Sequence, residues 1–203
     1  MNSTMFKRTK LKLTALSVLI VAAYVSFAVY LNFKFNIAAA SLSRIGWAEG
    51  GLLYLIFYVL LTASLLIYQA LLFNRLSDKK SRLLKVLTVA GAILIAAGAV
   101  FPVGESAPKA CVLLHKILCQ TGSALSIIAV TYMFALYCKK IKPNVKTAVL
   151  LYCGLLAVVA AAFIVLFTAA LFEIGSSLLF LLAMLCVNFG VLRCKKFLPK
   201  QLT

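Results

Sequence analysis

Charged residues are scarce in this chain, and acidic residues are scarcer still. Only 12% of the 203 residues are charged, and 4 Asp and Glu residues stand against 21 Lys and Arg residues. Apolar residues make up 65% of the chain, and the mean hydropathy is +1.09. Soluble domains are roughly half apolar and about a quarter charged. This composition excludes a water-soluble globular protein, a disordered segment and a nucleic-acid-binding domain, and it indicates a membrane protein with several spans.

Sequence patterns that carry enzyme chemistry are also missing. The chain has a single His and no CxxC pair, and it contains no GxSxG, Walker A, HExxH or GxGxxG motif. Cys111, His115 and Cys119 share one helix face, but a structural zinc site needs four ligands. We therefore expect no metal and no other cofactor. The sequence favours a protein that is not an enzyme, without excluding one.

Long apolar runs divide the chain at regular intervals. A transmembrane helix needs about 20 mainly apolar residues, and continuous runs favour helices over barrel strands. The sequence therefore predicts an all-α, polytopic integral membrane protein with one six-helix transmembrane domain over residues 1–203. The spans are expected at 13–33, 50–73, 86–103, 110–137, 147–171 and 175–192. The first run exceeds the roughly 7–15 residues of a cleavable signal peptide, so we interpret it as a retained anchor and leave its cleavage open.

Basic residues are concentrated in every second connection. Most of them lie within residues 7–12, 75–85, 139–146 and 193–200, and of the acids only Asp78 joins them. Basic loops remain on the cytoplasmic side of a membrane. The alternation predicts that both termini are cytoplasmic. The basic face is expected to attract anionic lipid headgroups and not nucleic acid.

Two adjacent ionisable residues, His115 and Lys116, are predicted to lie inside the fourth span, about 8–9 Å from its start. Ionisable residues within spans are costly and are therefore candidates for function. Five further residues are expected at the same outer end and complete the predicted ligand-binding cluster: Arg44, Trp47, Glu49, Glu105 and Glu173. An ion pair from Lys116 or Arg44 to one of the acids would lower the cost of burial. A purely architectural polar layer is the alternative.

Small residues form stripes on two predicted helices. Gly154, Ala157 and Ala161 share a face of the fifth, and Ala92 and Ala96, near Gly91 and Gly98, share a face of the third. Small residues let helix backbones approach closely in lipid. The stripes predict packing within the chain, with a dimer face as the weaker alternative, so a homo-oligomer is left open.

The region from the third to the fourth predicted helix resembles a known family. The stretch AGAILIAAGAVFPVGESAPKACVLLHKILCQTGSAL carries Phe101-Pro102 before a short polar loop and His115 early in the next helix. This pattern is similar to an uncharacterised prokaryotic six-span (DUF-type) family related to the DRAM/FRAG/SFK group, as is SLSRIGWAEG over residues 41–50. The resemblance implies six helices, cytoplasmic termini, no cofactor, and links to lipid organisation or trafficking. The chain is more basic, with shorter outer loops, than such relatives, which favours a bacterial cytoplasmic (inner) membrane.

Three functions are compatible with the sequence. The leading hypothesis is a non-enzymatic membrane protein whose extracytoplasmic cluster binds a lipid headgroup or a membrane protein partner. The second is a small transporter or channel with a cavity lined by tyrosine, threonine, Gln69, Gln120 and Asn188, although no acid is expected inside a span to relay protons. The third is a lipid-modifying enzyme with His115 as general base, which requires a Ser, Cys or carboxylate within about 3 Å.

Overall fold

The computed structural model describes residues 3–76, 81–139, 145–166 and 169–193. Within these ranges the chain forms seven helices and is all-α, as predicted. The helices are α1 (Ser3–Lys34), α2 (Leu42–Ala48), α3 (Leu52–Leu76), α4 (Arg82–Val100), α5 (Lys109–Cys138), α6 (Val145–Leu166) and α7 (Ala170–Arg193). Part of the predicted charge pattern lies outside the described residues, namely Asp78, Lys79, Lys80, Lys140, Lys142, Lys195, Lys196 and Lys200.

Five of the described helices are long and apolar enough to cross a membrane. Their apolar segments are Leu11–Lys34, Leu52–Leu76, Arg82–Val100, Lys109–Cys138 and Ala170–Val191. The protein is therefore an integral membrane protein with several apolar helices. The fifth predicted span, 147–171, corresponds to α6, whose apolar stretch Ala148–Ala161 is shorter. The count of six crossings thus stays a prediction.

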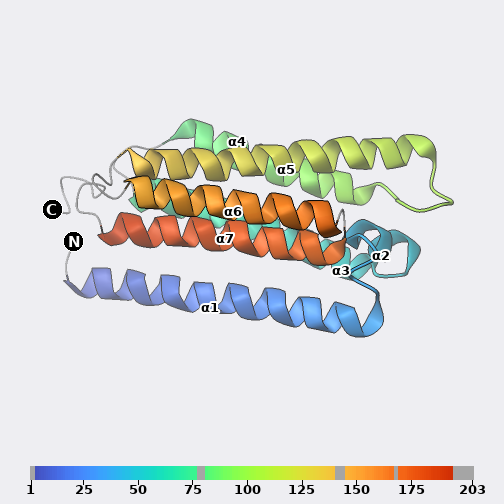
Figure 1. Ribbon diagram of the computed structural model, residues 1–203, viewed down its shortest axis with the longest axis horizontal. Helices are drawn as coiled ribbons and strands as arrows, with labels where there is room; N and C mark the ends of the chain where they lie inside the picture. Colours follow the sequence, from blue (N-terminus) through green and yellow to red (C-terminus); the bar gives the residue numbers. More distant parts are fainter. Residues whose placement is uncertain (1–2, 77–80, 140–144, 167–168, 194–203) are drawn as a thin grey trace.

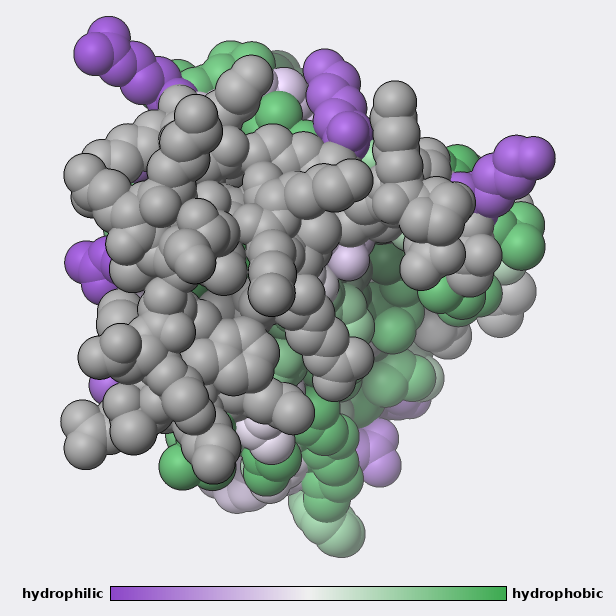
Figure 2. All heavy atoms as spheres, turned by 90° about the vertical axis from the view of Figure 1, so that its left-hand side faces the viewer, coloured by the Kyte–Doolittle hydropathy of each residue, from purple (hydrophilic) through white to green (hydrophobic). Residues whose placement is uncertain are grey.

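The six long helices lie side by side as one bundle (Figure 1). Helix α1 begins and α7 ends at the same end of this bundle, which we call the basic end. The opposite end carries α2 and the connection from α4 to α5, and we call it the α2 end (Figure 1). Hydrophilic side chains project around the rim of the basic end (Figure 2). Its described basic side chains are exposed to solvent: Lys12, Arg75, Arg82, Lys85, Lys139 and Lys146.

Polar side chains join neighbouring helices inside the bundle. The hydroxyls of Tyr24 on α1 and Thr62 on α3 lie 2.6 Å apart. Closer to the basic end, Gln69 Nε2 donates to the Leu181 carbonyl at 3.1 Å, and Asn188 Nδ2 donates to the Gln69 carbonyl at 3.3 Å. Lipid tails supply little hydrophobic force between helices, so such bonds and close packing hold the bundle together.

Of the two predicted stripes of small residues, the one on α4 packs against a neighbouring helix and the one on α6 does not. A Cβ atom added to Gly91 on α4 would lie 2.9 Å from the Gly122 carbonyl oxygen of α5, so these helices are in close contact as predicted. Gly154 on α6 has no atom within 4 Å of the same position, and Ala157 and Ala161 are exposed. The prediction that the α6 stripe packs within the chain is therefore wrong, because α6 turns this face away from its neighbours.

The α2 end contains more helical structure than the sequence predicted. Helix α2 occupies a connection for which no helix was expected, and Ser41 Oγ caps it by accepting the Arg44 amide. Helix α7 begins at Ala170, so Glu173 lies in its first turn and not in a loop. Helix α7 can begin this early because residues 37–40 accept its first amides. Ala170 N donates to Ala40 O at 2.7 Å, and Leu171 N donates to Ile37 O at 2.9 Å.

Candidate ligand-binding cavity

His115 is positioned by the close contact between α4 and α5. Its side chain is 8% exposed, and its Nδ1 lies 2.9 Å from the carbonyl oxygen of Gly98. A carbonyl oxygen only accepts, so Nδ1 is the donor in this bond. Gly98 lies in the last turn of α4, and its carbonyl also accepts the amide of Phe101, the residue after the helix, at 3.1 Å. The histidine therefore caps the carboxyl end of α4.

Trp47 of α2 caps the same helix end. Its indole Nε1 donates to the Ala99 carbonyl at 3.1 Å, one residue beyond the carbonyl that His115 binds. Two side chains from different helices thus satisfy consecutive carbonyls in the last turn of α4. This arrangement ties α2, α4 and α5 together at the α2 end. It gives Trp47 a specific partner, beyond its predicted part in the ligand-binding cluster.

Glu173 connects α7 to α2 and lies beside Tyr58 of α3. Its carboxylate Oε2 accepts the amide of Leu42, the first residue of α2, at 3.2 Å. The Tyr58 hydroxyl lies 2.8 Å from the Glu173 carbonyl oxygen and 2.6 Å from Ser177 Oγ. Sequence analysis expected no acid inside a span, and Glu173 corrects that expectation. Tyr58 was expected only as one of several tyrosines, since nothing in the sequence around it separates it from a packing residue.

A cavity of about 280 Å³ lies between α3, α4, α5 and α7, with Val159 of α6 also contributing to its wall. Near the α2 end its lining includes polar groups on four helices: Ser43, Tyr58, His115, Glu173, Ser176 and Ser177. Deeper in the bundle the lining is mostly apolar, with Leu66, Ile127, Val130 and Phe180. Ligand sites are typically apolar cavities with a few convergent polar groups. The cavity therefore has the character of a site for an amphipathic molecule.

One wall of the cavity is a row of polar side chains on α5. His115, Cys119, Ser123 and Ser126 all line it, at spacings of three and four residues that place them on one helix face. From His115 to Val130 the helix rises about 22 Å, so the cavity follows α5 over most of a bilayer's thickness. Sequence analysis noted the first two members of this row but assigned them no shared cavity.

The predicted cluster is divided between two places. His115 and Glu173 line the cavity, whereas Arg44, Trp47, Glu49 and Glu105 line a separate surface hollow of about 710 Å³ at the α2 end. Lys116 is exposed on α5 and lines neither of them.

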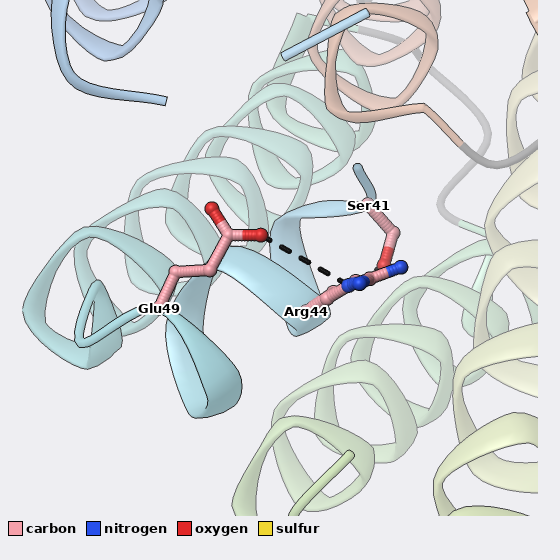
Figure 3. Close-up of polar contacts among 3 residues, drawn as sticks. All are labelled: Ser41, Arg44 and Glu49. Carbon is pink, nitrogen blue, oxygen red and sulfur yellow. Dashed lines mark hydrogen bonds and ion pairs between the residues drawn. The ribbon is translucent and has the colours of Figure 1, made fainter. Parts of the chain in front are cut away.

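The ion pair expected from Arg44 or Lys116 is formed by Arg44. Its Nε lies 3.9 Å from Glu49 Oε1, next to the Ser41 cap of α2 (Figure 3). Both side chains are partly exposed to solvent, at 60% and 35%, so the pair contributes little to stability. Among the described side chains, Lys116 has no acidic partner within 4.0 Å.

The transporter and enzyme hypotheses each require particular side chains at particular positions. Of the residues expected to line a transport cavity, Tyr58 and Thr62 do so, whereas Gln69 and Asn188 are buried between α3 and α7 and Gln120 is exposed. For catalysis, the nearest thiol to the imidazole is Cys119 Sγ, 3.9 Å from Nδ1. That nitrogen already donates to Gly98, so this thiol is not placed to give it a proton. Across the described part of the chain, no three His, Cys, Asp or Glu side chains are grouped as metal ligands.

Comparisons with protein-family models, with curated proteins and with solved structures each give no match to this chain. The family resemblance inferred from residues 90–125 therefore stays a prediction.

Proposed function

We propose that this integral membrane protein binds a membrane lipid in the cavity between α3, α4, α5 and α7. The headgroup would lie beside His115 and Glu173, and a hydrocarbon chain would extend along the apolar lining toward Val130. The supporting observation is the cavity itself, which joins a polar end to an apolar end within the membrane-spanning bundle. A lipid is the one class of molecule that is both abundant in the bilayer and amphipathic in this sense.

We also propose that the chain crosses the membrane six times, with its termini in the cytoplasm of a bacterium. Two observations support this topology. Helix α6 has 22 residues and so is about 33 Å long, enough for a hydrocarbon core of about 30 Å. The exposed lysines and arginines gather at the end where α1 begins and α7 ends, and such residues favour the cytoplasmic side. The polar end of the cavity would then lie in the outer leaflet.

Filling the cavity tests whether it holds the lipid. Ser123 and its neighbour Ala124 are both exposed on α5, but only Ser123 lines the cavity. We expect Ser123→Phe to reduce the lipid that co-purifies with the full-length protein several-fold, because the ring occupies the space of the ligand. The matched control Ala124→Phe should retain the wild-type amount. The measurement is native mass spectrometry of protein extracted in mild detergent.

The same preparation provides a check on folding. Both variants should elute as one species in size-exclusion chromatography and melt within a few degrees of the wild type. If a well-folded Ser123→Phe protein keeps its full complement of bound lipid, the cavity is not the lipid site and the proposal is wrong.

A further inference from the structure

The charge around the cavity has one sign. Among the described residues that line it, Glu173 is the only carboxylate, and no lysine or arginine is present. The chain as a whole is strongly basic, with a net charge of +17, but most of its lysines and arginines lie in the connections and at the helix ends, and none lines this cavity. The two basic residues that sequence analysis assigned to the site, Arg44 and Lys116, both lie outside the cavity.

One oxygen of the Glu173 carboxylate has no hydrogen-bond partner among the described residues. Oε2 accepts the Leu42 amide at 3.2 Å, whereas Oε1 has no hydrogen bond to any described residue. The neighbouring Tyr58 hydroxyl is occupied by the Glu173 carbonyl oxygen and Ser177 Oγ, and His115 Nδ1 is occupied by Gly98. The first turn of a helix favours a negative charge, and Glu173 lies in the first turn of α7. Glu173 Oε1 is therefore available to accept a hydrogen bond from a ligand.

Aromatic side chains line the same cavity as this acceptor. Tyr58, Phe172 and Phe180 contribute to the lining of the same cavity. The faces of aromatic rings carry partial negative charge and attract ammonium groups, most strongly where water is excluded. A carboxylate in a cavity that aromatic rings also line, with no lysine or arginine in the described lining, is suited to an organic cation and opposes an anionic headgroup.

We propose that the cavity selects amphiphiles that carry an ammonium group, which Glu173 Oε1 binds. This inference rests on the proposed lipid-binding function and adds the chemical class of the headgroup. The ammonium donates to Oε1 and faces the aromatic rings, while its hydrocarbon chain lies along the apolar lining. The volume of about 280 Å³ is close to the lower end of the range for ligand sites, about 300–1,000 Å³, so the cavity is suited to a headgroup and part of one chain, not to a whole two-chain lipid.

Headgroup preference of the full-length protein is the direct test. Native mass spectrometry would compare dioleoyl phosphatidylethanolamine with dioleoyl phosphatidylglycerol, which share their chains and differ in the headgroup. We expect a preference of about tenfold for the ethanolamine lipid, which corresponds to about 1.4 kcal/mol. Glu173→Gln should reduce this preference to near unity while both lipids still bind. Glu105→Gln, an exposed acid of the surface hollow, is the matched control and should keep the preference.

Competition with single-chain amphiphiles needs no variant and identifies the source of the ammonium. Dodecylammonium should displace the bound ethanolamine lipid from the wild-type protein, and dodecyl sulfate should not. If the bilayer lipid binds more tightly than dodecylammonium, the ligand is a lipid headgroup. If dodecylammonium binds more tightly, the ligand is a free long-chain amine. Both results support recognition of the ammonium group.

Two results would overturn this inference. One is equal binding of the two phospholipids by the wild-type protein, together with equal displacement by both dodecyl amphiphiles. The other is a Glu173→Gln protein that keeps the ethanolamine preference. Neither result contradicts the proposed lipid site, which is tested by Ser123→Phe. If Ser123→Phe loses the lipid but the wild-type protein shows no headgroup preference, the lipid site is supported and only the ammonium inference is wrong.

Discussion

Replacing Gly98 with alanine tests the contact between α4 and α5 that positions His115. A Cβ atom at this residue would lie 2.5 Å from Cys119 Sγ, 3.1 Å from Cys119 N and 3.3 Å from Leu118 Cβ. Non-bonded carbon atoms are most favourable at about 3.5–4.0 Å, so the facing atoms must move by about 1 Å. Rotation of the thiol alone does not make room, because the backbone nitrogen is also too close. The helices must separate, and the bond from His115 to the Gly98 carbonyl must lengthen.

The expected loss follows from two opposing effects. Forcing extra volume into a packed interior costs about 1–3 kcal/mol, whereas alanine in place of glycine favours a helix by up to about 1 kcal/mol. We therefore expect Gly98→Ala to lower the free energy of unfolding by about 1–2 kcal/mol. For a chain of this size that corresponds to a decrease in Tm of about 2–8 °C.

Tryptophan fluorescence reports this change directly. Trp47 is the only tryptophan, and its indole donates to Ala99, the residue after Gly98. Thermal unfolding of the purified protein in detergent, followed by this signal, gives the Tm. The control is Gly154→Ala on α6, where an added Cβ meets no atom within 4 Å and the Tm should not fall. Adding Cys119→Ala to Gly98→Ala removes the closest contact and should restore part of the loss.

The refuting result is equally specific. If the Tm of Gly98→Ala equals that of the wild type, close packing of α4 on α5 does not stabilise this end of the bundle. The same conclusion follows if Gly154→Ala lowers the Tm as much as Gly98→Ala does. A Cys119→Ala substitution that leaves the Gly98→Ala defect unchanged would show that the thiol is not the obstructing group.

Two further predictions concern the bundle and its orientation. A double-mutant cycle of Tyr24→Phe and Thr62→Val, measured by unfolding in detergent, should give a coupling of about 0.6–1.7 kcal/mol for their 2.6 Å hydrogen bond, and no coupling would contradict it. In a chain without its native cysteines, Ser106→Cys should react with an impermeant maleimide on intact cells, whereas Lys139→Cys should react only after permeabilisation. These residues are exposed at opposite ends of the bundle, so the reverse pattern would reject the proposed topology.

The long helices were predictable because the bilayer restricts the backbone. Within lipid each amide and carbonyl needs a partner inside its own segment, so a long apolar run leaves few alternatives to a helix. The expected span at 110–137 corresponds closely to α5, Lys109–Cys138, and that at 50–73 to α3, Leu52–Leu76. The boundary between the last two spans is displaced: the fifth was expected to reach residue 171, whereas α6 ends at Leu166, and the sixth was expected from residue 175, whereas α7 begins at Ala170. Hydropathy alone does not separate that end from the start of α7.

The α2 end was less predictable because its structure depends on contacts between distant segments. Ala40 and Ile37 accept the first amides of α7 from more than a hundred residues away, and this lets Glu173 enter the helix. Apolar periodicity carries no information about such bonds. Ser41 did precede α2 as a capping residue, and that was the one local signal for this short helix.

The amino-acid sequence by itself determined that this is an all-α membrane protein, roughly where its long helices run, and that His115 is the only histidine among apolar residues. These follow from composition and from the backbone's need for hydrogen bonds, which act locally along the chain. Only the tertiary structure decided that His115 bonds to Gly98, that Glu173 joins it around one cavity, and that Arg44 and Lys116 stay outside. Which way a side chain faces is set by the packing of α4 on α5 and of α7 on α2, and those contacts join residues that the chain itself keeps far apart.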